Sequence, residues 1–182
     1  SEWLWFQDDD IDLDVSNVNK LCDYLAGSEK NMVFLKIESS ESQGVSFKNY
    51  NFHRFTSHLR SLKISSIEIM VKPSFVRAND IHFDENLGLG SKFPSCEENL
   101  FVYQALKTGD SKSEFYDVPV ARHTLNLQSR DIDFHGRYAA QGYLVRRLEG
   151  VDRYIAFIVF FIKSVIFKRN KYMKYFMRGF RS

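Results

Sequence analysis

The residues best suited to chemistry lie near the start of the sequence, where three aspartates follow a short apolar stretch. Residues 3–6 (WLWF) predict a short buried strand, and Asp8, Asp9 and Asp10 come soon after it. Carboxylates packed this closely repel one another, and a divalent cation relieves the repulsion. Mg²⁺ or Mn²⁺, held by one or two carboxylates together with phosphate oxygens, is the usual occupant. The spacing predicts a metal site, although a solvated acidic turn ahead of the next helix explains it equally well.

The residues that follow exclude a calcium-binding loop. Asp8, Asp10 and Asp12 would fit the first three ligand positions of such a loop. Its sixth position would be Leu13, where the sharp turn requires glycine, and its twelfth would be Asn19 in place of a bidentate Glu.

A second acidic pair, Glu97 and Glu98, stands near the start of a helix expected from about residue 94 to Lys107. A carboxylate in the first turn of a helix stays ionised near neutral pH, because the helix dipole favours negative charge there. Such a group can act as a general base that takes the proton from an attacking hydroxyl. Ser95 and Glu98 also match the S-x-x-E capping box, so a purely structural role remains open.

His123 follows a strand expected over residues 116–121, and its neutral imidazole would suit a metal ligand. A lone histidine at a strand end is more often simply a polar residue, and both readings stay open. Cys22 and Cys96 have no nearby histidine in a recognisable nucleophile setting, so we expect both to be small packed side chains.

Residues 82–93 are expected to form a loop, because Gly88 and Gly90 give the backbone freedom there. Asp84 and Glu85 precede these glycines. A loop of this composition can shape a binding pocket and move when a ligand binds. An ordinary surface turn fits the same residues.

Strands and helices alternate along the chain, which predicts an α/β domain with a mostly parallel sheet. Open sheets of this kind collect ligands at the carboxyl ends of their strands, where the aspartates lie. Residues 38–51 are polar and are expected to be an exposed excursion, and Pro119 predicts an edge or strand-end position for its strand. The expected strands are 3–6, 32–37, 66–71 and 116–121, and the expected helices are 16–26 capped by Ser16, 94–107, 134–149 and 153–180.

Charge is unevenly distributed along the 182 residues, whose net charge is +2. From Arg153 to Ser182 there are eight Lys and Arg and no acid; the other 17 basic residues stand against all 23 acids, a net charge of −6. An acidic main body excludes a dispersed nucleic-acid footprint. Two distant cysteines cannot staple a secreted domain, which favours a cytoplasmic location.

Taken in order, these motifs resemble bacterial family 2 glycosyltransferases, which have the GT-A fold and often act in capsule or lipopolysaccharide assembly. The resemblance covers roughly residues 3–165. It is carried by WLWFQDDD, SSIEIMVKPSFV, IHFDENLGLGSKFPSCEENLFVYQALKTG, FYDVPVARH and GRYAAQGYLVRRL.

The resemblance implies a Rossmann-like sheet and a metal-dependent, inverting transfer of a sugar from a nucleoside diphosphate sugar to a saccharide or lipid-linked acceptor in surface polysaccharide synthesis. It also implies roles for individual residues. Asp8 and Asp9 would contact the nucleotide sugar, Asp10 and His123 would bind Mg²⁺ or Mn²⁺, Glu98 would be the catalytic base supported by Glu97, and Asp84, Glu85, Gly88 and Gly90 would form the acceptor loop.

The sequence departs from the family pattern at its start. In the family, the aspartate motif follows an N-terminal half of several βα units that binds the base and ribose, whereas here it begins at residue 8. We therefore expect residues 1–152 to be the C-terminal, metal- and acceptor-side half of a GT-A domain, and the activity of this chain alone is in question. The alternative is a truncated, non-catalytic acceptor-binding or membrane-associated interaction module.

The last 30 residues are apolar first and basic afterwards. Residues 154–167 are too short to span a bilayer, which takes about 20 apolar residues. The basic and aromatic residues that follow suit an interfacial helix on an anionic membrane surface, on the inner face of the plasma membrane. A core-packing helix with a solvated basic face is the alternative, and we expect no nucleic-acid partner.

Overall fold

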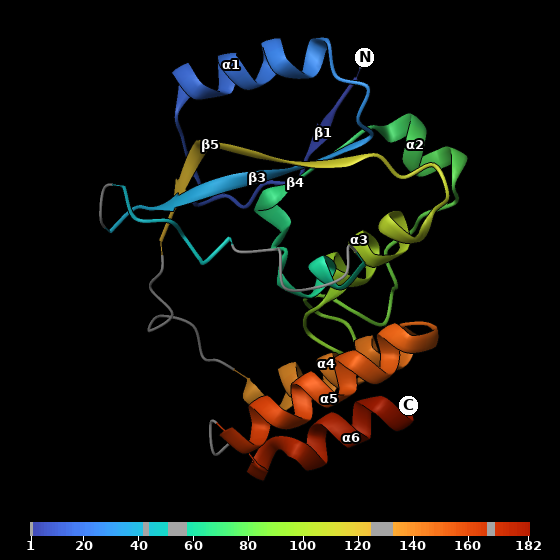
Figure 1. Cartoon of the computed structure of the whole chain (residues 1–182). Coiled ribbons are helices and arrows are strands. Elements are labelled where there is room, and N and C mark those ends of the chain that lie inside the picture. Colours follow the sequence, from blue (N-terminus) through green and yellow to red (C-terminus); the bar gives the residue numbers. More distant parts are fainter. Residues whose placement is uncertain (1, 42–43, 51–57, 125–132, 167–169) are drawn as a thin grey trace. The chain divides into compact units, whose positions relative to one another are not determined.

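The computed structural model describes residues 2–41, 44–50, 58–124, 133–166 and 170–182, which belong to two compact units (Figure 1). The first unit takes in residues 1–55, 64–81 and 105–129, and the second takes in residues 56–63, 82–104 and 130–182. The predicted α/β class is confirmed: the chain combines a curled five-stranded sheet with helices, as in a partial Rossmann-like fold.

The sheet of the first unit has the strand order β1-β4-β3-β5-β2. Its strands are β1 (Leu4–Trp5), β2 (Asp12–Leu13), β3 (Met32–Ser39), β4 (Ile69–Val71) and β5 (Ser113–His123). The prediction of a mostly parallel sheet is wrong: among the described strands only β3 and β5 pair in parallel, and the other three pairings are antiparallel. β4 runs between β1 and β3 in the opposite direction, and β2 folds back onto β5. As a result, β1, β3 and β5 all point the same way.

β3 forms the centre of the first unit's core. Its apolar run is almost completely buried, as expected for a strand covered on both faces. Helix α1 (Val15–Ala26) covers one of these faces and places Leu21 and Leu25 against Val33 and Leu35. The polar segment after β3 also forms two backbone hydrogen bonds with that strand. The N–H of Phe47 donates to Ile37 O at 2.9 Å, and the N–H of Ser39 donates to Val45 O at 2.7 Å. The described part of residues 38–51 is therefore paired in places; residues 42, 43 and 51 lie outside the described residues.

Helix α1 is capped by Asp14 and not by Ser16. Oδ1 of Asp14 accepts a hydrogen bond from the N–H of Asn17 at 3.0 Å. The helix begins at Val15, so its cap lies two residues before the expected Ser16. The side-chain amide of Asn17 donates to the carbonyl of Pro119 at 2.8 Å and ties α1 to β5.

Pro119 lies in the middle of an interior strand, so the expectation of an edge or strand-end position is wrong. β5 runs between β3 and β2, and Pro119 pairs with Lys36 at a point where the register between β3 and β5 shifts on either side of Lys36. Proline has no N–H to donate, and the irregular register removes the need for one.

The predicted strand 66–71 begins with a helical turn, η2 (Ser66–Glu68), and only β4 is extended. The Glu68 carboxylate accepts a hydrogen bond from the N–H of Ser65 at 2.7 Å, which closes that turn. The capping box that the S-x-x-E pattern describes is thus formed by Ser65 and Glu68. Helix α3 (Glu97–Lys107) instead follows Cys96, whose φ is +74°, so the start of that helix does not fit the predicted Ser95–Glu98 capping box. Pro73 opens a further short helix, α2 (Pro73–Ala78).

The second unit contains η1 (His58–Lys63), most of α3, α4 (Phe134–Arg147), α5 (Gly150–Ile166), η4 (Asn170–Tyr172) and α6 (Met173–Arg181). The single helix expected over residues 153–180 is therefore two helices, with residues 167–169 outside the described residues. Among the described residues, no helix is both long enough and apolar enough to cross a bilayer.

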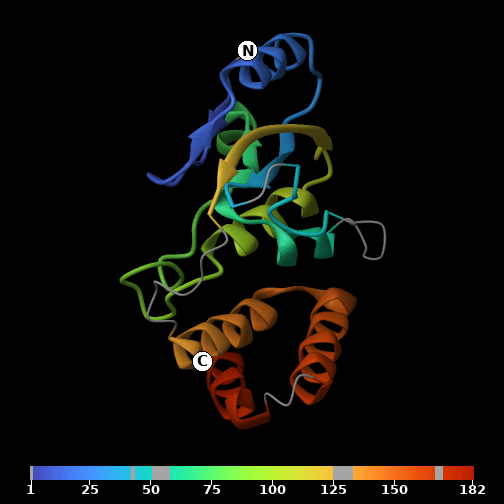
Figure 2. The same ribbon diagram turned by 90° about the vertical axis from the view of Figure 1, so that its left-hand side faces the viewer.

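Helices α4 and α6 lie side by side, as Figure 2 shows. They approach so closely because each carries a glycine at the contact. A Cβ on Gly142 would lie 1.9 Å from the carbonyl oxygen of Phe176, and a Cβ on Gly179 would lie 1.8 Å from that of Ala139. The buried ring of Phe176 then packs against Phe157, at 5.7 Å between ring centroids.

Candidate active site

The sheet brings the aspartates and His123 together because β1 and β5 point in the same direction. Asp8, Asp9 and Asp10 follow the carboxyl end of β1, and His123 is the last residue of β5. Nε2 of His123 lies 3.0 Å from Oδ1 of Asp10 and 3.9 Å from Oδ2 of Asp8. Asp9 is exposed in the turn beside them. Side chains from opposite ends of the first unit's sequence thus form one cluster.

The orientation of the His123 ring is set on its other side. Nδ1 lies 2.8 Å from the carbonyl oxygen of Thr124, and a carbonyl only accepts, so this contact assigns a proton to Nδ1. In neutral imidazole Nε2 then carries a lone pair, and it faces two carboxylates that are also acceptors. The ring is buried and meets Phe47 edge-on at 5.3 Å between centroids. Three acceptors directed at one point call for a cation or a proton between them.

The spacing of these atoms fits a small divalent ion. One ligand atom from each of Asp8, Asp10 and His123 lies within 4.8 Å of the others. Octahedral ligands at about 2.1 Å from Mg²⁺ are about 3.0 Å apart when adjacent and about 4.2 Å when opposite. The Nε2–carboxylate distances above fall in that range. Both carboxylates are partly exposed, which leaves room for water or phosphate oxygens in the remaining positions.

Sequence reasoning missed two neighbours of the cluster, Ser66 and Phe47. The hydroxyl of Ser66, at the start of η2, donates to Oδ1 of Asp8 at 3.4 Å. The polar composition around Phe47 predicted an exposed excursion and gave no sign that its ring would face His123. For Ser66 the available signal was the S-x-x-E pattern at residues 65–68, which predicts a helical turn at this point.

A buried charge pair lies behind Ser66. The Glu68 side chain is fully buried, and its Oε2 accepts from the ammonium group of Lys48 as well as from the N–H of Ser65. Burial raises the pKa of Glu68, and the adjacent Lys48 opposes that rise. The pair holds η2 in place and therefore also holds the Ser66 hydroxyl.

Glu97 and Glu98 form the first turn of α3 in the second unit, and both are partly buried. The Glu97 side chain packs over Gly88, since a Cβ there would lie 3.4 Å from Cδ of Glu97. Within the described residues, no hydrogen-bond partner faces the buried Oε2 of Glu97. Burial and the charges of Glu98 and Glu97 raise the pKa of the Cys96 thiol to about 12, so Cys96 is an inert packed side chain as expected. Cys22, by contrast, is exposed, and the expectation of packing is wrong for it.

The expected acceptor loop is tied to helix α4 through Asp84. Oδ1 of Asp84 accepts from the N–H and the side-chain amide of Asn86, and Oδ2 accepts from the Tyr143 hydroxyl at 3.0 Å and from Arg147 at 3.3 Å. Burial favours a higher pKa for Asp84, but these hydrogen bonds and the Arg147 charge outweigh it and lower the pKa. Asp84 is thus a structural anchor of the loop, whatever the loop binds.

The other residues of the expected acceptor loop have the backbone conformation and exposure of a surface turn. Gly88 and Gly90 have φ values of +106° and +81°, in the left-handed region that favours glycine, and Glu85 is exposed. The aspartate–histidine cluster belongs to the first unit, and Glu97, Glu98 and this loop belong to the second. The family resemblance implies that the metal residue Asp10 and the base Glu98 serve one reaction, and this stays a prediction.

The chain is similar in structure to S. aureus TarS 1–349, a glycosyltransferase, with a TM-score of 0.57 and 16% sequence identity. The similar region covers 84% of this chain and 44% of the TarS chain. At this identity the likeness shows a shared fold alone. The chain spans less than half the length of that structure. No family model and no curated protein matches the sequence.

Proposed function

We propose that this chain is the metal- and acceptor-side part of a family 2 glycosyltransferase. One observation carries the proposal: Nε2 of His123 faces the carboxylates of Asp8 and Asp10 at the carboxyl ends of β1 and β5, with Nδ1 held by Thr124. The likeness to the glycosyltransferase TarS supports the proposal, and so does the general rule that open α/β sheets bind their ligands outside the carboxyl ends of the strands.

Each residue has a defined task in this proposal. Asp10 and His123, with Asp8 beside them, hold Mg²⁺ or Mn²⁺, which when bound stabilises the charge that develops on the diphosphate leaving group. Asp8 and Asp9 contact the nucleotide sugar. Glu98 takes the proton from the acceptor hydroxyl as that oxygen attacks the sugar carbon, which inverts the configuration.

The proposed donor is a nucleoside diphosphate sugar, and the proposed acceptor is a saccharide or lipid-linked saccharide of bacterial surface polysaccharide synthesis. The acceptor would bind next to residues 84–90, and the reaction would take place in the cytoplasm, at or near the inner face of the plasma membrane. This chain supplies the metal and acceptor residues of that reaction.

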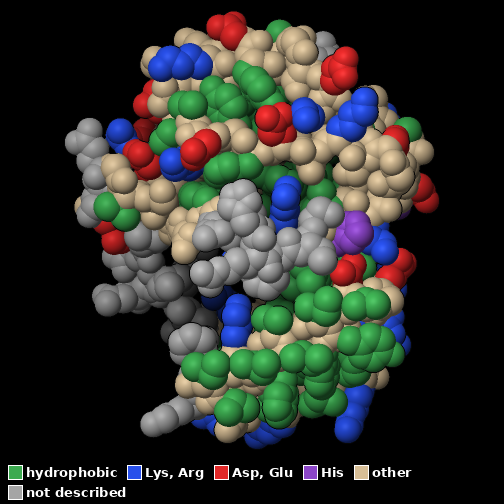
Figure 3. Space-filling model, in the orientation of Figure 1, with side chains coloured by type: hydrophobic (Ala, Val, Ile, Leu, Met, Phe, Trp, Pro, Cys, Tyr) green, Lys and Arg blue, Asp and Glu red, His purple; other side chains and the backbone are tan. Residues whose placement is uncertain are grey.

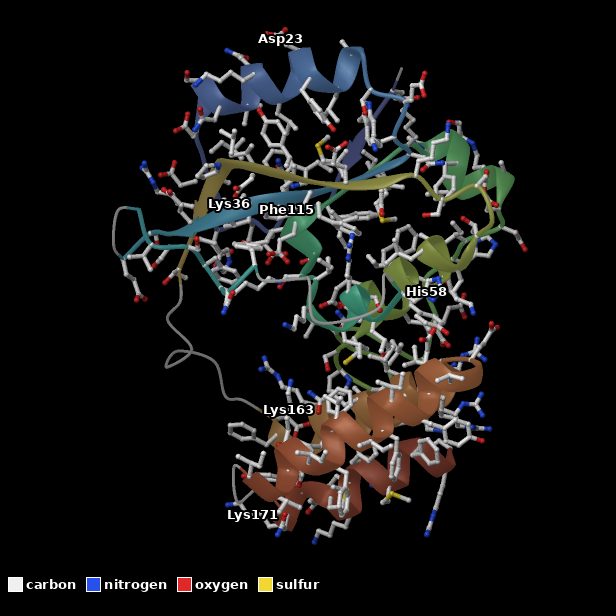
Figure 4. The ribbon with its side chains drawn as sticks, in the orientation of Figure 1. Asp23, Lys36, His58, Phe115, Lys163 and Lys171 are labelled. Carbon is white, nitrogen blue, oxygen red and sulfur yellow. The ribbon has the colours of Figure 1, made fainter. Side chains whose placement is uncertain are left out.

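Metal binding by the 182-residue chain tests the proposal without requiring turnover. Titration with Mn²⁺, followed by the loss of the free-ion electron paramagnetic resonance signal, should show one site. Asp10→Asn and His123→Ala should each weaken Mn²⁺ binding on the order of 10-fold to 100-fold. In other metal sites, removing only a residue that hydrogen-bonds to a ligand already has an effect of that size. Asp23→Asn is the matched control, because Asp23 is an exposed acid on α1 (Figure 4). Equal Mn²⁺ affinity for wild type and Asp10→Asn would contradict the metal site and favour the non-catalytic alternative.

A further inference from the structure

Helix α5 presents an apolar face that the described chain leaves exposed. Seven of its side chains are between 48% and 71% exposed and recur at helical spacing: Val151, Tyr154, Ile158, Phe161, Ile162, Val165 and Ile166. We call these residues the α5 stripe. The opposite side of the helix does the packing, with Ala156 and Ser164 buried and Phe157 and Phe160 against Phe176. A continuous exposed stripe of this size marks an interaction surface.

Basic side chains border the α5 stripe. Lys171, Lys174, Arg178 and Arg181 are exposed at intervals of three, four and three residues, which places them on one side of η4 and α6. Lys163 is an exposed residue of α5 itself, and Figure 4 labels it together with Lys171. In Figure 3 the apolar side chains of this region form one green area with Lys and Arg along its lower margin. No acid occurs between residues 153 and 182.

Aromatic rings accompany these basic residues. The ammonium group of Lys171 lies 5.0 Å from the Tyr172 ring centroid, and that of Lys174 lies 4.8 Å from the Tyr175 ring centroid. The exposed His135 ring stacks on Tyr175 at 4.1 Å. Tyrosine and lysine side chains, each with an apolar body and a polar tip, suit the layer between lipid headgroups and acyl chains.

We propose that α5 and α6 form a docking face for an anionic lipid surface, with the α5 stripe in the acyl boundary and the basic residues of α6 on the headgroup phosphates. Such a surface supplies both an apolar layer and negative charge, which the two parts of the face require. A second copy of the chain would set basic residues against basic residues, with no acid in this segment to pair with them. In this proposal α5 lies along the bilayer surface and does not cross it, because its 17 residues fall short of the about 20 apolar residues that a spanning helix needs.

Co-sedimentation of the 182-residue chain with phosphatidylcholine vesicles, with and without phosphatidylglycerol, tests this proposal. The chain should bind the anionic vesicles more tightly, and added salt should weaken the binding. Lys174→Gln with Arg178→Gln should lower the affinity for anionic vesicles about 5-fold per charge, or about 25-fold together. Ile158→Ser with Phe161→Ser should reduce binding to both kinds of vesicle. Val15→Ser, at a 70% exposed side chain of α1, is the matched control and should bind like wild type.

Circular dichroism checks that each variant keeps its helices. Absence of wild-type binding to anionic vesicles would overturn the proposal, and so would variants of the α5 stripe that bind as well as wild type. Light scattering of the chain without lipid measures whether the α5 stripe instead binds a second copy of the chain. A dimer that the Ile158→Ser and Phe161→Ser changes convert to a monomer would assign the face to a second copy instead.

Discussion

At the scale of single residues, the environment of each carboxylate decides what it can do. Asp10 lies beside an imidazole nitrogen, and Glu98 lies in the first turn of a helix. Both oxygens of Asp84 are already engaged, in three hydrogen bonds and one ion pair. The three groups have similar chemistry in isolation. Their partners make one a ligand candidate, one an anchor and one a base candidate.

Glu98→Gln is the test of the base. In the proposed glycosyltransferase, this change should reduce turnover on the order of 10²–10⁴-fold, because the amide cannot accept the acceptor's proton. The free energy of unfolding should fall by less than about 1 kcal/mol, the usual size of a helix-dipole interaction. Turnover and thermal unfolding are measured on the same preparation. Asp23→Asn, at the exposed acid of α1, is the control and should turn over like wild type. Near-normal turnover for Glu98→Gln would transfer the base assignment to Glu97.

Asp84→Asn should destabilise the second unit in a pH-dependent way. The pKa of Asp84 is lowered from 3.8 in the folded chain, so the ionised carboxylate stabilises the fold above pH 3.8, and this contribution disappears as the pH falls through the lower folded pKa. Near neutral pH the change should cost about 1–3 kcal/mol, as for hydrogen bonds to a charged group.

Thermal unfolding of wild type and Asp84→Asn at neutral and acidic pH measures this effect. The difference between the two proteins should shrink at acidic pH. Glu85→Gln, at the exposed neighbour, should unfold like wild type at both pH values. A difference that does not depend on pH would mean that the Asp84 charge contributes nothing to stability.

At the scale of elements, the sequence predicted where most strands and helices lie along the chain. It did not predict the turn at η2 or the directions in which strands pair, because both depend on residues distant in the sequence. The alternation of strands and helices indicated the α/β class, and the strand-end rule indicated where Asp10 and His123 would lie. The alternation of Ser66-Ile67-Glu68 predicted a strand where η2 lies, although the S-x-x-E pattern at residues 65–68 also fits a helical turn. It forms because Glu68 is buried with Lys48, a residue from a different segment. Pairing direction likewise depends on β4 lying between β1 and β3, which periodicity does not encode.

Lys48→Met tests the pair that holds η2. The change leaves the Glu68 carboxylate buried without its cation, and the free energy of unfolding should fall by about 3–5 kcal/mol. Adding Glu68→Gln should recover part of that loss, because the buried charge is gone. Urea unfolding gives both values.

Lys36→Met is the matched control, because the partner of Lys36 is the 75% exposed Asp117 and such pairs contribute about 0–1 kcal/mol. Equal losses for Lys48→Met and Lys36→Met would show that burial of Glu68 does not matter to the pair.

At the scale of the whole molecule, the two compact units have different stabilising features. The first depends on the buried strand β3, and the second depends on the close contact of α4 and α6 at Gly142 and Gly179. Backbone approach at glycine leaves no space for a methyl group, so a small substitution there acts on a whole helix pair.

Gly142→Ala should therefore affect the second unit selectively. Its added Cβ would meet the Phe176 carbonyl oxygen, and we expect the helix pair to lose about 1–3 kcal/mol or more. Hydrogen exchange should become faster for amides of α4 and α6 and stay slow for amides of β3. Gly27→Ala is the control, since a Cβ there meets nothing within 4 Å. Equal acceleration in β3 would mean that the two units unfold together.

The distance along the chain between Asp10 and His123 has a consequence for protein synthesis. The two residues are 113 positions apart. At about 5–20 residues per second, roughly 6–23 s pass between the translation of one codon and the other. During that interval the nascent chain carries an acidic cluster without its imidazole. The three side chains of the proposed metal site can therefore come together only after the ribosome has synthesised β5, and no shorter nascent chain can form that site.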